Sequence, residues 1–464
     1  MLGPGEEEFA LSRGSRVVLH ESGVLHPAGA AQRFTPYSEL IHVTLDARAL
    51  RIGATRGSWR IPRAAFALPG GAQTLARALC ARMAGLPDGA AREQRQHALD
   101  RRLGESRRVW LGIGLAGVCA ALYLLGRFVP GLSMEGEYWG EFGFASEPWR
   151  LVTAQLLHAG LAHFALNALG LVALGGLLER QLGLSRAALV FAASGLGAML
   201  GCAVAAYDRV VGASGLVAGA AGALLALELF RPQLLPTPWR LPRRLLAGAI
   251  VADAVLLLYV PNVAHAAHVG GFLAGGAAAL ALAPRRASAP RSGPALRLAS
   301  ASALVLVLVA LGALARSVAD PDLAATRRAE RLLADERTNA LALNNYAWTL
   351  AVSERPSEQQ LRVALSLARR AVRDTQRNDP NLLDTLAEVY FQIGRAGDAI
   401  ATIDAAIELA PDEPYFREQR RRFEGERAAD DRPDPPDEQP SIVPEPRPEP
   451  EEPEFDDAGP GVSV

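Results

Sequence analysis

The chain has 464 residues, 50% of them hydrophobic, and a net charge of -1 at pH 7. This length exceeds that of one ordinary soluble domain, and the balanced charge argues against a protein that binds nucleic acid with its whole surface. All 48 basic residues are arginine, which excludes Schiff-base lysines, phosphate-loop lysines and Ser-Lys protease dyads.

The cysteines show no pattern of a disulfide framework or metal site, and the first residues show no pattern of a signal peptide. Cys80, Cys119 and Cys202 lie far apart, without the spacing of metal ligands or of a disulfide framework. We interpret them as small buried hydrophobic side chains. The first residues, MLGPGEEEFALSRGSR, lack the positive-then-apolar pattern of a signal peptide.

Residues 1–100 are expected to form a small soluble α+β domain. Short runs of strand character, such as ELIHVTLDARALRIGA, fall between residues 10 and 86 and end in the amphipathic stretch GAQTLARALCARMAGL. Several strands capped by one helix resemble, in composition, a bacterial pleckstrin-homology-like (PH-like) domain. A small adaptor domain without a ligand is an equally good interpretation.

A series of apolar runs follows, each about as long as a membrane span. A spanning helix needs about 20 apolar residues, and soluble proteins do not carry so many such runs. We therefore predict a mainly α protein with a polytopic membrane helix bundle: six core spans in residues 109–285 and a seventh at 296–315. The runs lie at about 109–129, 151–178, 187–206, 211–230, 245–260, 262–283 and 296–315.

Arginine placement predicts the orientation of these spans. The loops on one side hold only Arg127, Arg150 and Arg209 before the last span. The other side is therefore expected to be cytoplasmic, together with the N-terminus, and a seventh crossing would place later residues outside the cytoplasm. The arginine-rich side contains Arg101, Arg102, Arg107, Arg108, Arg180, Arg186, Arg231, Arg240, Arg243, Arg244, Arg285, Arg286 and Arg291.

Residues 323–425 have the pattern of helical repeats. The stretch LDTLAEVYFQIGRAGDAIATIDAAIELAPDEP is similar to the tetratricopeptide repeat (TPR), whose period is about 34 residues, and an earlier copy precedes it. Such repeats stack into a groove for peptide segments, which implies a peptide or protein partner. The acidic, proline-rich tail 426–464 is expected to be disordered.

Polar residues inside the predicted spans are the strongest functional signal, because ionisable groups in a bilayer are costly. His163 and Asn167 are four residues apart and are expected on one helix face, whereas His158 is expected on the same helix but rotated away. The set comprises His158, His163, His265, His268, Asn167, Ser214, Glu179 and Asp253.

Glycine stripes follow Ser214 and His268. Gly215, Gly219 and Gly222 share one face after the serine, and Gly271 and Gly275 share a face with the histidine. Two glycine-lined faces can pack backbone to backbone, which would bring the serine against the histidine. A histidine within hydrogen-bond reach of a serine hydroxyl is the minimal activated nucleophile. Helix packing without chemistry is the alternative.

A histidine metal site or transporter is the rival chemistry. Four histidines could hold zinc, but an HExxH pair and cysteine ligands are both absent. We therefore predict no metal and no cofactor.

The segments PWRLVTAQLLHAGLAHFALN, GGLLERQLG, GASG and AHVGGFLAG, in this order, resemble a rhomboid intramembrane serine protease. The resemblance implies Ser214 as nucleophile and His268 as general base and later acid. It also implies an oxyanion site made by His163, Asn167 and backbone N–H groups near Ser214. The remaining motif residues are structural by the same resemblance: Trp149, Arg150, Glu179, Gly212, Gly215, Gly271 and Gly275.

One position departs from the family pattern. Many members carry an aromatic ring four residues after the nucleophile, but Ala218 stands here. The resemblance gives Asp253 no role.

The expected function is cleavage of the transmembrane segments of other membrane proteins, with lipid as surroundings and no nucleic-acid partner. The alternative is an inactive rhomboid-like protein that binds membrane helices and scaffolds partners through its repeats. The expected location is a bacterial inner membrane, with the repeats outside the cytoplasm.

Overall fold

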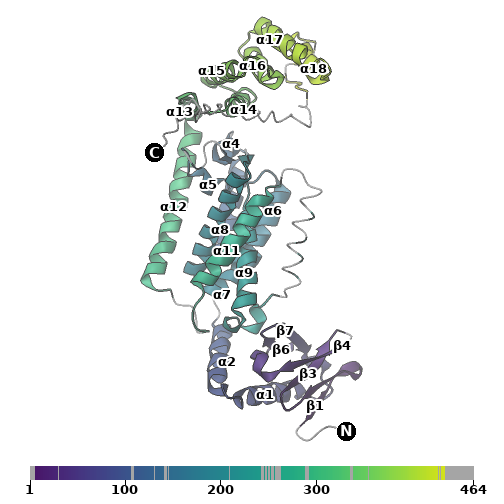
Figure 1. The fold of residues 1–464 in the computed structure, drawn as a ribbon. Helices are drawn as coiled ribbons and strands as arrows, with labels where there is room; N and C mark the ends of the chain where they lie inside the picture. The colour runs from purple at the N-terminus through teal and green to yellow at the C-terminus, as the bar shows by residue number, and fades with distance from the viewer. Residues whose placement is uncertain are drawn as a thin grey trace, which may run out of the picture. The chain divides into compact units, whose positions relative to one another are not determined.

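The computed structural model describes residues 6–433 with short gaps, and it divides into two units, Met1–Asp320 and Pro321–Val464. Figure 1 shows the helices and strands of both units. The residues outside the description are 1–5, 30, 106–108, 130, 141–143, 145, 208, 242–244, 246–247, 249–250, 252–254, 256–262, 288–291, 335–337, 354, 427, 429 and 434–464.

The chain begins with two antiparallel sheets packed against a helix. β1–β4 form a four-stranded sheet and β5–β7 a three-stranded one, each in sequential order. Leu75, Leu79 and Met83 recur every fourth residue on one face of α1, and all three are buried against the sheets. The predicted β domain is therefore confirmed, and the PH-like resemblance stays a prediction. The elements are β1 (Glu7–Ala10), β2 (Arg16–Leu19), β3 (Gly23–Ala28), β4 (Ala31–Pro36), β5 (Leu40–Leu45), β6 (Ala49–Ala54), β7 (Gly57–Pro62) and α1 (Gly71–Ala84).

A second helix, α2 (Gly89–Gly104), was not expected, because its sequence GAAREQRQHALDRRLG has no apolar stripe. Polar side chains hold it on the domain. Arg92 donates to the backbone carbonyls of Leu40 and Ser38 at 2.9 Å each. Gln96 bonds both the N–H and the carbonyl of Val43. Periodicity of hydrophobic residues cannot reveal a helix that is held in this way.

The membrane region is a helical bundle. Four helices are long and apolar enough to cross a membrane: Leu161–Leu182, Leu184–Val204, His265–Leu282 and Pro294–Ala319. Two shorter apolar helices, α3 and α9, complete the described part of the bundle. The helices are α3 (Leu111–Leu125), α6 (Leu161–Gly170), the π-helical turn η4 (Leu171–Gly175), α7 (Gly176–Leu182), α8 (Leu184–Val204), α9 (Ser214–Phe230), α11 (His265–Leu282) and α12 (Pro294–Ala319).

One predicted span differs from the structure, and another lies mostly outside the described residues. The run 151–178 is not one helix: a single turn, α5 (Arg150–Thr153), is followed by irregular backbone, and the helix begins at Leu161. The apolar run is interrupted by the polar residues Gln155 and His158 and then by Gly160. The run 245–260 and Asp253 lie almost wholly outside the described residues, so the predicted number of spans stays a prediction.

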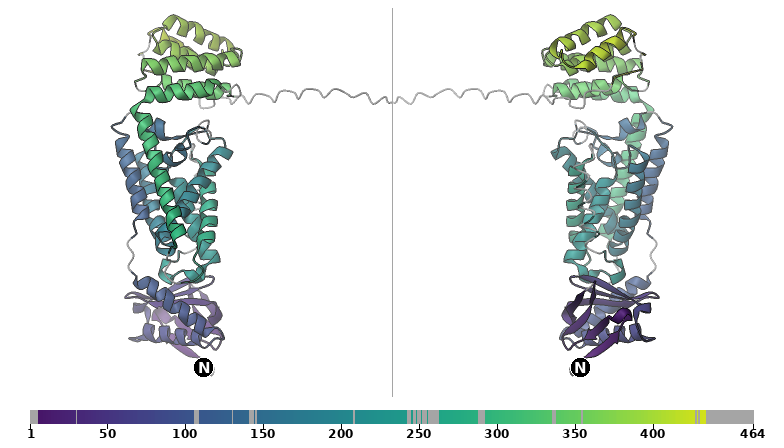
Figure 2. Two further views of the ribbon diagram at one scale, coloured as in Figure 1. Left: turned by 90° about the vertical axis from the view of Figure 1, so that its left-hand side faces the viewer. Right: turned by 90° about the vertical axis from the view of Figure 1, so that its right-hand side faces the viewer.

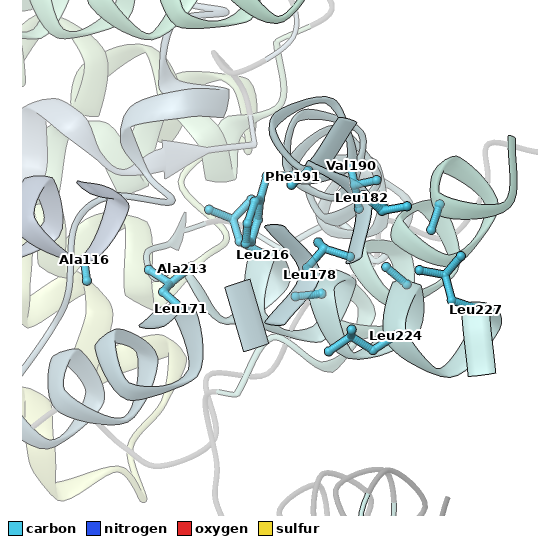
Figure 3. Packing of buried hydrophobic residues seen from close by; sticks show 14 of the residues in the cluster. Ala116, Leu171, Leu178, Leu182, Val190, Phe191, Ala213, Leu216, Leu224 and Leu227 are labelled. Atoms are coloured by element: carbon cyan, nitrogen blue, oxygen red, sulfur yellow. The ribbon is translucent and has the colours of Figure 1, made fainter. Parts of the chain in front are cut away.

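The centre of the bundle is filled by aliphatic side chains. Leu216, Leu224 and Leu227 of α9 pack with Leu178 and Leu182 of α7 (Figure 3). α11 lies between α8 and α9 (Figure 1). The helix that carries Ser214 and the helix that carries His268 are therefore direct neighbours.

α12 runs along the outside of the bundle, as Figure 2 shows from two further sides. It packs on α8 and on the short elements α4 (Leu132–Gly136) and α5. Leu314 is 2% exposed and meets Leu132 and Leu157 there. The predicted run 296–315 thus lies within one continuous apolar helix.

The N-terminal domain is held on the loop that follows α9. The Thr237 N–H donates to His42 Nδ1 at 3.0 Å, so Nε2 carries the ring proton and donates to Asp100 Oδ1 at 3.1 Å. Burial raises the pKa of Asp100, but the hydrogen bonds from His42 and Gln96 outweigh it, and this pKa lies below its ordinary value. A Cβ at Gly53 would lie 2.6 Å from Thr237 Oγ1, so the contact requires glycine.

A buried ion pair lies beside this contact. Arg240 bonds Glu228 of α9 at 2.7 Å and the carbonyl of Ala54 in β6 at 2.7 Å. Both charged side chains are almost fully buried. The last turn of the Ser214 helix is therefore fixed to the sheet of the N-terminal domain.

The second unit consists of helical hairpins. α14 packs on α15 and α16 on α17. Ala347, Ala364, Ala387 and Ala399 have no exposed surface, and Gly394 turns the chain with φ +78°. The TPR assignment stays a prediction. The helices are α13 (Pro321–Ala334), α14 (Ala340–Ala351), α15 (Glu358–Asp374), α16 (Pro380–Gln392), α17 (Ala396–Leu409) and α18 (Pro414–Phe423).

Candidate active site

Ser214 is the first residue of α9 and follows a strand and a tight turn. The short strand β9 (Arg209–Val210) pairs with β8 (Tyr138–Trp139), and Gly212 then turns with φ +129°. The Gly212 N–H donates to the Ala154 carbonyl at 2.9 Å. The serine therefore lies at a helix N-terminus, where backbone N–H groups are not used within the helix and favour negative charge.

His163 lies against the backbone of Gly212. A Cβ at Gly212 would be 2.6 Å from His163 Cε1 and 2.7 Å from Nε2. Glycine is thus required here both by the positive φ and by the imidazole. Asn167 is 5% exposed and donates from Nδ2 to the His163 carbonyl at 2.9 Å. The two predicted oxyanion residues share one face of α6, as their spacing indicates.

The glycine stripes of α9 and α11 meet backbone to backbone. A Cβ at Gly271 would collide with the Gly215 carbonyl, and one at Gly275 with the Gly219 carbonyl. Residue numbers rise together along both helices, so α9 and α11 run parallel in a fixed register. A Cβ at Gly215 would also lie 3.5 Å from the Ala267 carbonyl, so the residue before His268 lies beside the residue after Ser214. The first turns of the two helices therefore lie side by side.

A third glycine-lined helix was missed. A Cβ at Gly197 of α8 would lie 2.5 Å from the Gly270 carbonyl, and one at Gly201 would collide with the Ala266 carbonyl. Here the numbers run in opposite directions, so α8 and α11 are antiparallel. The four-residue spacing of Gly197 and Gly201 was a visible signal of this contact. α11 is thus held closely on two sides.

His158 does not lie where it was predicted. It precedes α6, and its ring centroid is 5.1 Å from that of His163. The backbone N–H of Ala213 approaches His158 Nε2 at 3.5 Å. The expectation of a side chain rotated away was wrong, because it assumed a helix continuous through residue 158. His158 is therefore part of the polar cluster next to the serine turn.

His265 and His268 occupy the first turn of α11, with ring centroids 5.8 Å apart. The Tyr207 hydroxyl lies 3.5 Å from the Ala266 N–H, and its ring packs among Ala264 and Ala267. Tyr207 thus places an aromatic side chain at the first turn of α11, while half-buried Ala218 has none.

The described residues contain no group of three or more His, Cys, Asp or Glu side chains arranged to hold a metal ion. The arrangement of serine, histidines and asparagine instead offers a hydroxyl, an imidazole and N–H donors at one end of the bundle. These are the groups that acyl-transfer chemistry uses.

Residues 145–285 match the family described as Rhomboid domain. RHOMBOID-like protein 6 (mitochondrial) of Arabidopsis thaliana is 34% identical over 30% of this chain and 44% of its own length. RHOMBOID-like protein 5 of the same plant is 32% identical over 33% of this chain and 50% of its own length. These findings support the rhomboid family.

The Rhomboid protease GluP of Bacillus subtilis (strain 168) is 33% identical over 31% of this chain and 28% of its own length. The chain spans about half the length of the first Arabidopsis relatives that it matches. The similarity thus concerns the rhomboid domain, and the protein is an integral membrane protein.

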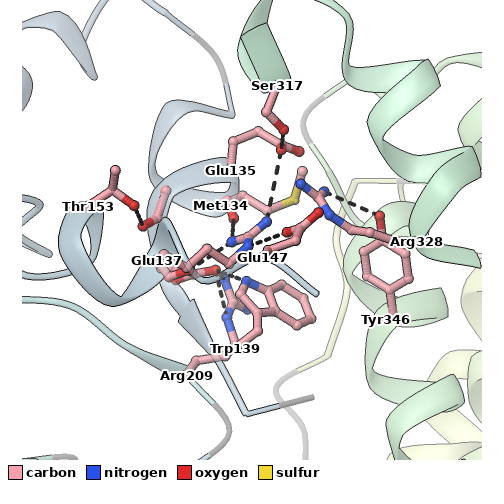
Figure 4. A network of polar contacts seen from close by, with 12 residues as sticks. Met134, Glu135, Glu137, Trp139, Glu147, Thr153, Arg209, Ser317, Arg328 and Tyr346 are labelled. Carbon is pink, nitrogen blue, oxygen red and sulfur yellow. Dashed lines mark hydrogen bonds and ion pairs between the residues drawn. The ribbon is translucent and has the colours of Figure 1, made fainter. Parts of the chain in front are cut away.

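Arg150 organises the loop before α6. Its partners Glu137 and Glu147 belong to a network of polar contacts that also includes Arg209 (Figure 4). Arg150 is 1% exposed, forms an ion pair with Glu147 and donates to the Glu137 carbonyl at 2.7 Å. Trp149 lies beside it, with its ring 4.9 Å from the guanidinium carbon. Glu137 in turn accepts from Arg209 at 2.9 Å, next to the strand that leads to Ser214. These contacts give Trp149 and Arg150 a structural position in this loop.

Glu179 lies at the other end of the rhomboid domain. Its carboxylate accepts from the backbone N–H groups of Trp110 and Leu111 at 2.9 and 2.8 Å. A carboxylate at a helix N-terminus satisfies free N–H groups and complements the helix dipole. Glu179 therefore fixes the start of α3 to the end of α7.

Proposed function

We propose that this protein is an intramembrane serine endopeptidase that cleaves transmembrane segments of other proteins. The observation that supports it most is the backbone contact between α9 and α11, which brings together the first turns of the helices that carry Ser214 and His268. The rhomboid relatives support the same class, since GluP is named a protease.

In this mechanism His268 accepts the proton of the Ser214 hydroxyl as the oxygen attacks the scissile carbonyl. The carbonyl carbon becomes tetrahedral and its oxygen takes up the negative charge. His268 then gives the proton to the leaving amine, and water hydrolyses the acyl-enzyme by the reverse proton path.

The oxyanion would be stabilised by donors beside the serine. The backbone N–H groups at the start of α9, the His163 ring and the Asn167 amide are the candidates. One Asn167 N–H is used by the His163 carbonyl, and an amide carries a second. Loss of one such donor typically lowers the rate on the order of a hundred- to thousand-fold.

The other regions have proposed roles as well. The helical hairpins of the second unit would bind a peptide or protein partner as tetratricopeptide repeats, outside the cytoplasm. The membrane would be a bacterial inner membrane. The N-terminal domain would lie in the cytoplasm. Its contact with the arginine-rich loop at Arg240 supports this orientation.

Membranes labelled with a fluorophosphonate probe test the proposal. We expect the wild-type protein to be labelled, and Ser214→Ala and His268→Ala to be labelled no more than background. Ser300→Ala, which removes a half-buried serine of α12, is the matched control and should label like wild type. His265→Ala tests whether the other histidine in the first turn of α11 is the base instead.

Wild-type labelling no stronger than that of Ser214→Ala would overturn the protease proposal. It would favour a rhomboid-like protein that binds membrane helices without cleaving them, the alternative that Ala218 motivates. Inhibition of cleavage by a chelator would instead indicate a metal site.

A further inference from the structure

A cavity of about 530 Å³ lies at the end of the bundle away from Ser214 and His268. It is bounded by α2 of the N-terminal domain, by the residues that follow α9 and by the end of α11. Its volume falls within the range of roughly 300–1,000 Å³ that is common for ligand sites. It joins the N-terminal domain to the ends of the two helices proposed to carry the catalytic dyad.

Four arginines line this cavity. Arg95 comes from α2, Arg231 directly follows α9, and Arg285 and Arg286 lie just beyond α11. The cavity lining, within the described part of the chain, contains no acidic side chain. None of the ion pairs formed between described residues involves these four arginines. Four positive charges therefore meet around one space whose described lining contributes no carboxylate.

Arginines at the cytoplasmic end of a bundle are ordinary, because they orient membrane proteins. Two observations distinguish this group. The arginines come from three separate elements and line one cavity that is open to solvent. In addition, Leu234 and Leu280 line the same cavity, so that it has an apolar part beside its charged part.

This combination fits a ligand with a phosphate and an apolar portion. Guanidinium groups bind phosphate oxygens with paired hydrogen bonds, and basic pockets at this level of a bundle suit anionic headgroups. The apolar helix α11 ends at Leu282, which places the cavity where the hydrocarbon region gives way to the headgroups. We propose that the cavity binds the phosphate of an anionic phospholipid from the adjacent leaflet.

A bound headgroup would connect three elements. Arg95 would tie α2 to the phosphate, while Arg231, Arg285 and Arg286 would tie the ends of α9 and α11 to it. Lipid binding would then reinforce the docking of the N-terminal domain beside the Arg240–Glu228 ion pair. The site takes its ligand whether or not Ser214 is a nucleophile, so it can be tested without protease activity.

Native mass spectrometry of the full-length protein in detergent measures the binding. The protein is titrated with short-chain phosphatidylglycerol, short-chain phosphatidylcholine and inorganic phosphate. We expect phosphatidylglycerol to bind at least tenfold more tightly than phosphatidylcholine. Arg285→Gln/Arg286→Gln should lower its affinity roughly tenfold or more, in keeping with the loss of two charges near the headgroups. Arg231→Gln, on another element, should lower it as well.

The double variant Arg180→Gln/Arg297→Gln removes two exposed arginines at the same end of the bundle but outside the cavity, and should bind like wild type. Unchanged melting of each variant without lipid shows that the fold is intact. Equal losses in both double variants would overturn the site, since the effect would then be general surface charge. Inorganic phosphate binding as tightly as phosphatidylglycerol would overturn the lipid source, and equal binding of phosphatidylcholine would overturn the charge recognition.

Discussion

Helices pack by different means in the two units. In the rhomboid domain, α11 meets α9 and α8 through glycines, and a single added methyl group would strike a backbone carbonyl. In the second unit, helices meet through fully buried alanines together with larger side chains such as Leu367 and Leu383. Lipid offers little hydrophobic driving force for helix association, so close van der Waals contact between backbones must stabilise the packed helices. In the second unit, removal of apolar surface from water drives the burial of the alanine faces.

The comparison also bears on function. A glycine contact fixes the register of two helices more tightly than a layer of flexible side chains does. In the membrane bundle that register brings the first turn of α11, which carries His268, beside the start of α9. The glycines are thus required for packing and, in our proposal, for catalysis.

The largest expected effect comes from filling the glycine contact. Gly271→Leu should force α11 away from the Gly215 carbonyl and cost at least about 3 kcal/mol, enough to abolish both the folded bundle and probe labelling. Gly117→Leu is the matched control, because a Cβ there meets no atom within 4 Å. Thermal unfolding in detergent measures the difference. Equal melting of the two variants would show that backbone contact does not hold this bundle.

Breaking the buried ion pair at the end of α9 should cause the next largest loss of stability. Arg240→Met leaves Glu228 buried without its partner, and loss of one member of such a pair costs about 3 kcal/mol or more. We expect lower melting and faster proteolysis between the N-terminal domain and the bundle. Arg51→Met, which removes a partly exposed pair with Asp46, should change melting less. Resistance of Arg240→Met to proteolysis would contradict this account of the docking.

An alanine contact in the second unit should yield a smaller and local effect. Ala387→Leu in α16 overpacks a fully buried position and should cost about 2 kcal/mol. Ala401→Leu, on the exposed face of α17, is the control. The cost is measured from the midpoint of the thermal unfolding transition of this unit. Probe labelling should stay at the wild-type level. A loss of labelling in Ala387→Leu would show that the two units do not pack independently.

The smallest effect depends on pH. Burial, and to a smaller extent the nearby Glu388 carboxylate, raise the pKa of Asp384 to about 7. In the unfolded chain this carboxyl titrates near pH 4. The folded unit therefore holds a proton that the unfolded chain lacks, and the stabilisation is lost as pH rises through about 7.

Between pH 6 and pH 7 this loss amounts to about 1 kcal/mol. Asp384→Asn keeps an acceptor for the Tyr415 hydroxyl. In this variant the stability of the second unit should fall less between the two pH values. Melting of the second unit at the two pH values measures it. An unchanged slope in the variant would assign the decline to other groups.

Sequence patterns predicted the features that repeat locally along the chain. The serine turn, the His163–Asn167 face and the stripes of Gly215, Gly271 and Gly275 follow from spacing within single helices. The strands of the N-terminal domain were likewise predicted from alternation.

Features that depend on contacts between distant segments were not predicted. The bond between His42 and Thr237 joins residues 195 positions apart. α2 has no apolar stripe because hydrogen bonds to backbone hold it. His158 was misplaced because apolar composition alone did not show where α6 begins. The catalytic roles of Ser214 and His268 stay predictions that rest on family resemblance and helix register.

The central claim is that Ser214 is the activated nucleophile at the glycine contact between α9 and α11. Peptide mass spectrometry of wild-type protein after reaction with a fluorophosphonate locates the modified residue directly. We predict one phosphonyl adduct on the Ser214 hydroxyl, absent from His268→Ala. An adduct on another serine, or an unmodified Ser214 in folded protein, would contradict the account.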